Sequence, residues 1–263
     1  MYEFDYHCAT SLDDAAGRLS DADAKLVAGG MTLIPTLKLR LAKPTQLIDL
    51  AAISGLKGIT EEADAVVIGA MTRHADVNRS EVVRRGIPAL AAMAGMIGDP
   101  AVRNRGTIGG SIANNDPAAD YPAAVVALNA TVRTNQREIA ADQFFTGMFE
   151  TALDPGEIVT AVRFPKVAQA NYQKFRNPAS RYAIVSVFVA KTPAGVRVAV
   201  TGAGPCVFRV PAMEAALAGN FTADAIRDIQ IPQDGLNSDI HASAEYRAHL
   251  VNVMARRAVA ACA

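Results

Sequence analysis

The sequence predicts an α+β fold, in which helices and strands alternate at first and a strand-rich segment with a closing helix follows. Within residues 1–50, apolar runs of strand length alternate with helical patterns. Further along, two apolar runs flank the turn-prone residues KTPAG at 191–195, as in a hairpin. The last stretch, 243–263, has apolar residues at helical spacing. The 263 residues, 51% hydrophobic, suffice for one large domain or for two or three smaller ones.

The first part of the chain is predicted to form a small βαβ-like lobe. The pattern places strands at 2–7, 24–29 and 46–50, and helices at 11–19 and 33–41. Ser11 followed by Asp14 is an acidic variant of a capping box, which marks the start of the first helix. Strand, helix, strand, helix and strand in this order indicate a compact α/β unit.

The middle and last parts contain strands, two helices and then the hairpin and closing helix. We expect strands at 65–72, 131–134 and 157–164, the last two paired, and helices at 87–98 and from Pro122 onward. Pro165 is predicted to mark the boundary between the middle and last parts. Beyond it, the hairpin strands surround residues 191–195, and the closing helix runs to the end.

Charge and cysteine content exclude several classes of protein. Lys plus Arg and Asp plus Glu both number 26, so no overall attraction to nucleic acid or to an anionic membrane is expected. The N-terminal residues lack the basic and apolar regions of a signal peptide, which predicts a cytoplasmic protein without a transmembrane segment. Cys8, Cys206 and Cys262 are widely spaced and predict reduced structural thiols.

Motifs of self-contained catalysis are missing. The sequence has no GxSxG, HExxH or GxxxxGK[ST] pattern, which disfavours a hydrolase, a metalloenzyme or a kinase. The histidines, at positions 7, 74, 241 and 249, do not form a metal-ligand set in the sequence. GAGPCV at 202–207 begins like a dinucleotide fingerprint but lacks the third glycine, so we interpret it as a strand end or hairpin turn.

Two glycine-containing loops are suited to a pyrophosphate. AGGMT at 28–32 follows a buried strand, and TIGGS at 107–111 precedes the polar run NNDPAAD at 114–120. Glycine pairs allow backbone N–H groups to approach an anion closely, and flanking Thr and Ser hydroxyls can donate to its oxygens. Either loop alone is more often a simple turn. Together they indicate a shared binding site.

Three segments in this order resemble the FAD-binding medium subunit of molybdenum hydroxylases, the carbon monoxide dehydrogenase and xanthine dehydrogenase family. They are AGGMTLIPTLKLRLAKPTQLIDL, RNRGTIGGSIANNDPAADYPAAVVAL and SAEYRAHLVNVMARR, and the resemblance covers essentially the whole chain. It implies a two-lobed FAD-binding domain of the vanillyl-alcohol-oxidase (PCMH) type at 1–165, with lobes of about 1–55 and 56–165. A C-terminal sheet-plus-helix domain follows at 166–263.

The resemblance also implies which residues bind FAD. Those matching its two loops are Ala28, Gly29, Gly30, Met31 and Thr32, and Thr107, Ile108, Gly109, Gly110 and Ser111. The family often has AGGHS in the first loop, so Met31 and Thr32 depart from the pattern and put side-chain contacts there in question. Backbone contacts tolerate both changes. Asn114 and Asp120 match polar contacts to FAD, although Asp120 could equally cap the helix that Pro122 opens.

Three more residues match positions near the flavin ring. Ile158 matches a residue whose backbone meets the ring, and Lys174 and Tyr182 match a lysine and an aromatic residue close to it. A nearby cation stabilises an anionic reduced flavin, and an aromatic side chain shields a ring face. The alternatives are a buried strand isoleucine, a surface lysine on a strand and a core tyrosine.

The function implied by the resemblance is electron transfer. In that family a molybdenum-cofactor large subunit hydroxylates the substrate, [2Fe-2S] clusters of a small subunit pass the electrons on, and the FAD subunit delivers them to quinone, oxygen or NAD. The chain would then need no catalytic residue and no metal of its own, and would work in a hetero-oligomer, a dimer of heterotrimers. The alternatives are a stand-alone flavin oxidoreductase of the same fold, such as the reductase of peptidoglycan precursor synthesis, and a FAD-free assembly subunit.

Overall fold

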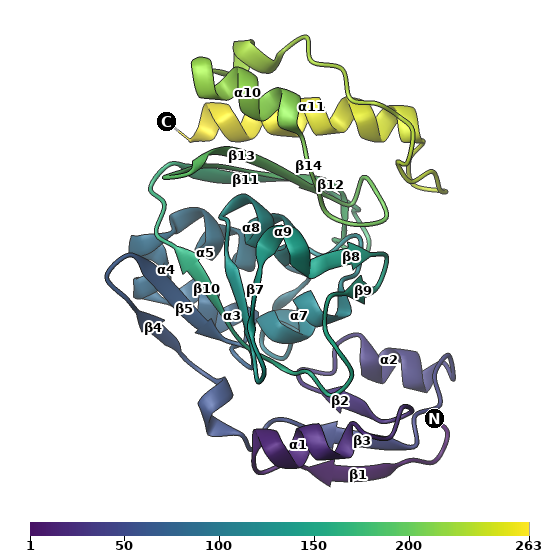
Figure 1. Cartoon of the computed structure of the whole chain (residues 1–263). Coiled ribbons are helices and arrows are strands. Elements are labelled where there is room, and N and C mark those ends of the chain that lie inside the picture. The colour runs from purple at the N-terminus through teal and green to yellow at the C-terminus, as the bar shows by residue number, and fades with distance from the viewer. Residues whose placement is uncertain (263) are drawn as a thin grey trace.

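The computed structural model describes residues 1–262. Its three main sheets, each with its own helices, are arranged one after another along the molecule (Figure 1). The N-terminal lobe lies at the bottom of the view, a larger middle lobe follows, and the C-terminal sheet and helices lie at the top. The predicted α+β fold class is confirmed.

The N-terminal lobe is a parallel sheet of three strands in the order β1-β3-β2. Its elements are β1 (Asp5–Cys8), α1 (Leu12–Arg18), β2 (Lys25–Val27), α2 (Leu33–Lys38) and β3 (Gln46–Asp49). The Ser11 hydroxyl accepts a hydrogen bond from the Asp14 N–H, which confirms the predicted start of α1. The helix α2 ends before the predicted residue 41, because Arg40 has a left-handed backbone with φ of 60°.

The middle lobe is a five-stranded sheet in the order β4-β5-β10-β6-β7, with helices against it. The strands are β4 (Ile59–Glu61), β5 (Ala65–Gly69), β6 (Thr131–Thr134), β7 (Glu138–Ala140) and β10 (Val159–Pro165). The helices are α3 (His74–Arg79), α4 (Glu81–Gly86), α5 (Pro88–Gly95), α6 (Pro100–Arg103), α7 (Ile108–Asn114), α8 (Tyr121–Ala127) and α9 (Ala141–Phe144), after a 3-10 turn at Ser54–Leu56. The predicted pairing of β6 with β10 is confirmed as antiparallel.

A small hairpin projects from the middle lobe. It consists of β8 (Phe145–Gly147) and β9 (Glu150–Thr151), which form a two-stranded sheet of their own. The sequence patterns did not predict it, because its strands are too short to show a period. In Figure 1 it lies at the side of the molecule, between the N-terminal lobe and the C-terminal part.

The C-terminal part is an antiparallel sheet with helices on its outer face (Figure 1). Its elements are β11 (Ala170–Arg176), β12 (Ala183–Thr192), β13 (Gly195–Thr201), β14 (Phe208–Arg209), α10 (Pro211–Gly219), a 3-10 turn at Ala223–Ile226, and α11 (Ala244–Ala261). The predicted hairpin is β12–β13, and residues 202–207 follow the end of β13 without forming a helix.

The strand β12 is apolar on both faces because it lies between two cores. Phe188 belongs to the cluster that fills the middle lobe, whereas Val187 and Val189 pack in the cluster under α10 and α11. Neighbouring residues of a strand point to opposite faces, so each face contacts one core. The C-terminal sheet therefore closes the core of the middle lobe as well as its own.

Candidate functional site

The first predicted loop, 28–32, joins β2 to α2 and has free backbone donors. Gly30 has a φ of 72°, a conformation that favours glycine. A Cβ at Gly29 would lie 2.2 Å from the carbonyl oxygen of Arg105, so a larger residue does not fit there. Among the hydrogen bonds of residues 1–262, none has the N–H of residues 29–32 as donor. These donors are free to receive an anion.

The second predicted segment is the start of a helix, so the prediction of a loop at 107–111 is wrong. Thr107 caps α7, and its hydroxyl accepts from the Gly110 N–H at 3.2 Å. The N–H groups of Ile108 and Gly109 donate to the carbonyls of Thr72 and Ala70, at 3.1 and 2.8 Å. The helix is thus fixed to the end of β5, and these N–H groups already have partners.

The two segments meet, as the sequence predicted for a shared site. A Cβ at Gly110 would lie 3.6 Å from the Ala28 Cβ and 3.0 Å from the Thr107 hydroxyl oxygen. Neither the Ser111 nor the Thr32 hydroxyl has a hydrogen-bond partner within residues 1–262, and both side chains reach the surface. The free N–H groups of the first segment and these two hydroxyls fit the pyrophosphate of a dinucleotide such as FAD.

The polar run after α7 contains a residue that sequence reasoning missed. The predicted Asn114 is half-buried and has no side-chain hydrogen bond within the described chain. Its neighbour Asn115 ends α7 with φ of 42° and is 1% exposed. The Asn115 amide donates to the carbonyls of Gly147 and Glu150, each at 2.8 Å. Asparagine tolerates the left-handed backbone conformation that often ends a helix, and this preference could have identified Asn115 from the sequence.

Asp120 and Lys174 form a buried ion pair between the middle lobe and β11. The Lys174 Nζ lies 2.8 Å from an Asp120 oxygen, and the side chains are 2% and 5% exposed. Tyr172, which sequence reasoning missed, donates its phenol proton to Asp120. Asp120 makes no cap hydrogen bond to α8, so the capping alternative is wrong. The alternative of a surface lysine at 174 is also wrong.

Burial governs the protonation of this cluster. It raises the pKa of Asp120, and the charge and hydrogen bond of Lys174 oppose this rise. Burial, the Asp120 charge and the hydrogen bond to it raise the pKa of Tyr172 well above its usual value. The phenol therefore keeps its proton at neutral pH, as its role of donor requires. Tyr172 and Lys174 are two residues apart on one strand and share a face, which was the signal for finding Tyr172.

Tyr182 and Ile158 differ in how far they are open to a ligand. Tyr182 is 49% exposed, which makes the core-tyrosine alternative wrong. Partial burial, followed by the charges of Asp116 and Asp120, raises its pKa. Ile158 is 1% exposed, its N–H donates to the Asn135 side-chain oxygen at 2.8 Å, and its carbonyl accepts from the Asn135 N–H. The backbone of Ile158 is thus engaged by Asn135.

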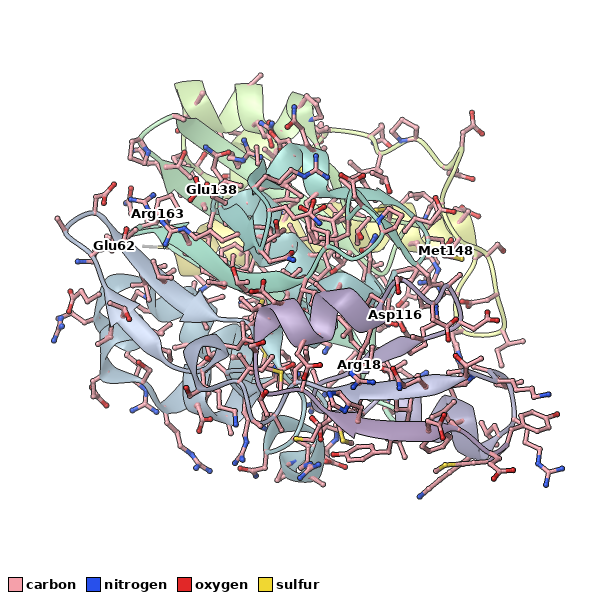
Figure 2. All side chains as sticks on the ribbon, turned by 60° about the horizontal axis from the view of Figure 1, so that its bottom comes forward. Arg18, Glu62, Asp116, Glu138, Met148 and Arg163 are labelled. Carbon is pink, nitrogen blue, oxygen red and sulfur yellow. The ribbon has the colours of Figure 1, made fainter. Side chains whose placement is uncertain are left out.

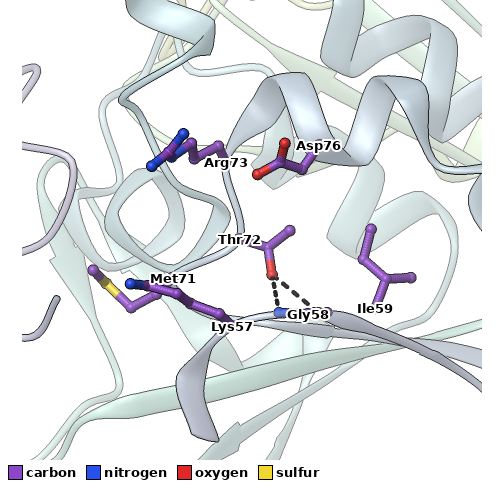
Figure 3. Close-up of a pocket in the computed structure, with 7 residues that line it drawn as sticks. All are labelled: Lys57, Gly58, Ile59, Met71, Thr72, Arg73 and Asp76. Carbon is purple, nitrogen blue, oxygen red and sulfur yellow. Dashed lines mark hydrogen bonds between the residues drawn. The ribbon is translucent and has the colours of Figure 1, made fainter. Parts of the chain in front are cut away.

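Two cavities lie outside the predicted residues. One, of 460 Å³, borders the connection of the lobes and is lined by Lys57, Gly58, Ile59, Met71, Thr72, Arg73 and Asp76 (Figure 3). At this cavity, the Thr72 hydroxyl accepts a hydrogen bond from the Gly58 N–H and donates one to the Gly58 carbonyl, each at 3.0 Å. The other, of 500 Å³, lies in the C-terminal part between 204–212 and 230–236. None of the predicted site residues lines either cavity.

Residues 1–262 hold no cluster of three or more side chains suited to a metal ion. The three cysteines are free. No helix in this part of the chain has the length and apolar character needed to cross a membrane.

Two family models together match nearly the whole chain. "FAD binding domain in molybdopterin dehydrogenase" matches residues 2–167, and "CO dehydrogenase flavoprotein C-terminal domain" matches residues 170–262.

Curated relatives and solved structures agree with these matches. The carbon monoxide dehydrogenase medium chain of Hydrogenophaga pseudoflava is 36% identical, over 97% of this chain and 96% of its own length. The nicotine 6-hydroxylase medium subunit of Paenarthrobacter nicotinovorans is 37% identical, over 97% and 95%. The structure of carbon monoxide dehydrogenase from Hydrogenophaga pseudoflava that lacks the Mo-pyranopterin moiety superposes with a TM-score of 0.90 and 37% identity, over 99% of this chain and 97% of that one.

Proposed function

The chain belongs to the family of FAD-binding medium subunits of molybdenum hydroxylases, and on that premise we propose that it passes electrons from iron–sulfur clusters of a partner subunit through FAD to an external acceptor. FAD is its cofactor, and the chain is an oxidoreductase subunit that works within a multi-subunit complex. Bound FAD supplies the redox chemistry, and the chain supplies its binding, orientation and electrostatic environment.

The observation that carries the proposal is the meeting of the two predicted segments. The unpartnered N–H groups of residues 29–32 and the hydroxyls of Thr32 and Ser111 are the donors for the pyrophosphate. Gly29 permits the close contact of the loop with Arg105, and Gly110 keeps the space beside Ala28 open. In this role Met31 and Thr32 replace the family's usual histidine and serine without loss of the backbone donors.

The proposal assigns Asn114 and Asp120 to polar contacts with FAD, and Lys174 and Tyr182 to positions near the flavin ring. Lys174 provides a positive charge that its partner Asp120 holds in place at 2.8 Å. Tyr182 is exposed enough to cover a ring face, and its phenol lies in the field of Asp116 and Asp120. The proposal also places the backbone of Ile158 near the ring; its N–H donates to Asn135, and its carbonyl, which accepts from the Asn135 N–H, has a second lone pair.

We also propose the division into a FAD-binding domain at 1–165 and a C-terminal domain at 166–263. Pro165 is the last residue of β10, and the next strand belongs to another sheet. The partners in this proposal are a molybdenum-cofactor large subunit and a [2Fe-2S] small subunit, assembled as a dimer of heterotrimers.

Purification from cells that express the complete complex tests the proposal. We expect a yellow complex with stoichiometric FAD in which this chain is accompanied by a large and a small subunit. A yellow single chain that turns over a substrate by itself would show a stand-alone flavoenzyme instead. A colourless protein would identify an assembly subunit without FAD.

A further inference from the structure

The tip of the hairpin β8–β9 exposes two large apolar side chains. Met148 and Phe149 follow each other between the two strands and are 49% and 55% exposed. Neighbouring exposed residues of this kind are unfavourable in water. Methionine and aromatic residues are enriched in the buried centres of protein interfaces.

The conformation of Phe149 is strained as well. Its φ of 57° lies in the left-handed region, where a bulky residue is an outlier because its Cβ crowds the backbone. Glycine or asparagine would occupy this position at lower cost. Strain of this type persists where the surroundings impose it, and it concentrates at functional sites.

Asn115 imposes this conformation. Its carbonyl accepts from the Phe149 N–H at 3.2 Å, and its side-chain amide holds the carbonyls of Gly147 and Glu150 on either side of the tip. Asn115 is itself buried and left-handed. The tip is therefore a preformed feature, which lowers the entropic cost of binding a partner.

The tip lies next to Asn114, which the proposal assigns to FAD. Asn115 directly precedes Asp116 and follows Asn114, and Met148 and Asp116 lie at the same edge of the molecule (Figure 2). Any protein that covers Met148 and Phe149 therefore also lies next to the proposed flavin site.

We propose that Met148 and Phe149 are a docking point for the iron–sulfur subunit that supplies electrons to this chain, an inference that rests on the proposed function. The donor of electrons must approach the flavin, and the tip presents exposed, fixed apolar groups near that site. The partner surface has an apolar pocket that accepts the Phe149 ring, with polar residues around it.

The test uses the full chain loaded with FAD and the purified iron–sulfur subunit. Phe149→Gly and Phe149→Asn remove the ring, and both residues tolerate the left-handed backbone. We expect each variant to bind the iron–sulfur subunit about tenfold more weakly or worse, as expected for an interface hot spot. The isolated variants should unfold at no lower temperature than the original chain, because the strain at 149 is relieved.

The control is Ile240→Gly, which removes a side chain that is 95% exposed on a loop of the C-terminal part. It should leave the Kd unchanged. Equal Kd values for the Phe149 variants and the original chain would overturn the inference. It would also be overturned if the Phe149 variants lost affinity for the large subunit only, or lost self-association of this chain. A change in FAD affinity or absorption of these variants without any partner would overturn it as well. If the original chain itself fails to bind the iron–sulfur subunit, the proposed function fails together with the inference.

Discussion

Gly110 keeps open the space between the two segments that we assign to the pyrophosphate. Gly110→Val places a branched side chain against Ala28 and should abolish FAD retention, while the fold survives because the nearest atom to a Cβ is the Thr107 hydroxyl at 3.0 Å. The exposed helical residue Gly17 offers a matched control, since a Cβ there meets nothing within 4 Å. FAD content per purified chain is the measurement, with circular dichroism to check folding. A folded Gly110→Val protein with its full complement of FAD would remove this residue from the site.

The effect of the Lys174 charge on the flavin potential depends on its ion-pair partner Asp120. Lys174→Met should make the flavin harder to reduce, because it removes a cation and leaves the buried Asp120 carboxylate without its partner. A loss of about 1.4 kcal/mol from the reduced state corresponds to about 30 mV for a two-electron couple. The double variant Lys174→Met with Asp120→Asn should recover part of the shift. Potentiometric titration of the flavin measures both, and an unchanged potential in the single variant would exclude Lys174 as a tuning residue.

His74 makes the stability of the fold depend on pH. Burial, reinforced by the positive charge of Arg103, lowers the pKa of His74 from 6.5 to about 4. Between these two pH values, His74 is protonated in the unfolded chain but stays neutral in the folded chain. The free energy of unfolding therefore falls as the pH decreases from 6.5 to 4. The contribution is on the order of 3 kcal/mol, since a tenfold change in proton affinity corresponds to about 1.4 kcal/mol.

His74→Phe should flatten this part of the pH profile. Urea unfolding at a series of pH values provides the measurement. Equal slopes for the original chain and His74→Phe would mean that other groups cause the loss of stability in acid.

At the scale of single residues, sequence reasoning found glycines but could not anticipate ion pairs. Gly29 and Gly30 could be recognised as loop residues because they stand between a predicted strand and a predicted helix. The burial of Lys174 was not predictable, since its partner Asp120 is 54 positions away in sequence and Tyr172 joins them only in the folded protein. A lysine on a strand gives no sign of burial by itself.

Among the elements, α11 is attached to the sheet by its apolar face and by one buried arginine. Arg247, 3% exposed, donates to the carbonyls of Ile184 and Gly202 at 2.6 and 2.9 Å and pairs with Asp239 at 2.7 Å. Arg247→Met should cost on the order of 3 kcal/mol, because buried carbonyls lose their donor. Arg257→Met, at an exposed position of the same helix, should have little effect on urea unfolding. Equal midpoints for the two variants would contradict this role of Arg247.

Elements with a clear period were predictable, and those fixed by tertiary contacts were not. The β12–β13 hairpin and α11 follow from apolar runs, a turn signal and helical spacing. The helix α7 has two glycines in its first turn, which have low helix propensity, and its start is stabilised by hydrogen bonds to Thr72 and Ala70 instead. A pattern confined to residues 107–111 does not contain that information.

For the whole molecule, the proposed FAD site draws on all three layers. The N-terminal lobe contributes residues 28–32, the middle lobe contributes α7 and Asp120, and β11 contributes Lys174. The C-terminal sheet packs Tyr172 and Phe188 into the core of the middle lobe, so it cannot move away without exposing apolar surface. The family and its FAD cofactor were recognisable from three quoted segments, whereas the relative placement of the layers follows from packing across the whole chain.

The central claim, that this chain relays electrons and does not oxidise a substrate itself, is tested most directly by anaerobic rapid mixing with detection of flavin absorbance. Loaded with FAD and freed of partners, the chain should be reduced by dithionite but not by carbon monoxide, an aldehyde or an N-heterocycle. After reconstitution with the molybdenum and iron–sulfur subunits, the substrate of the complex should reduce the flavin. Reduction of the flavin in the pure single chain by one of these substrates, with no metal present, would contradict the account.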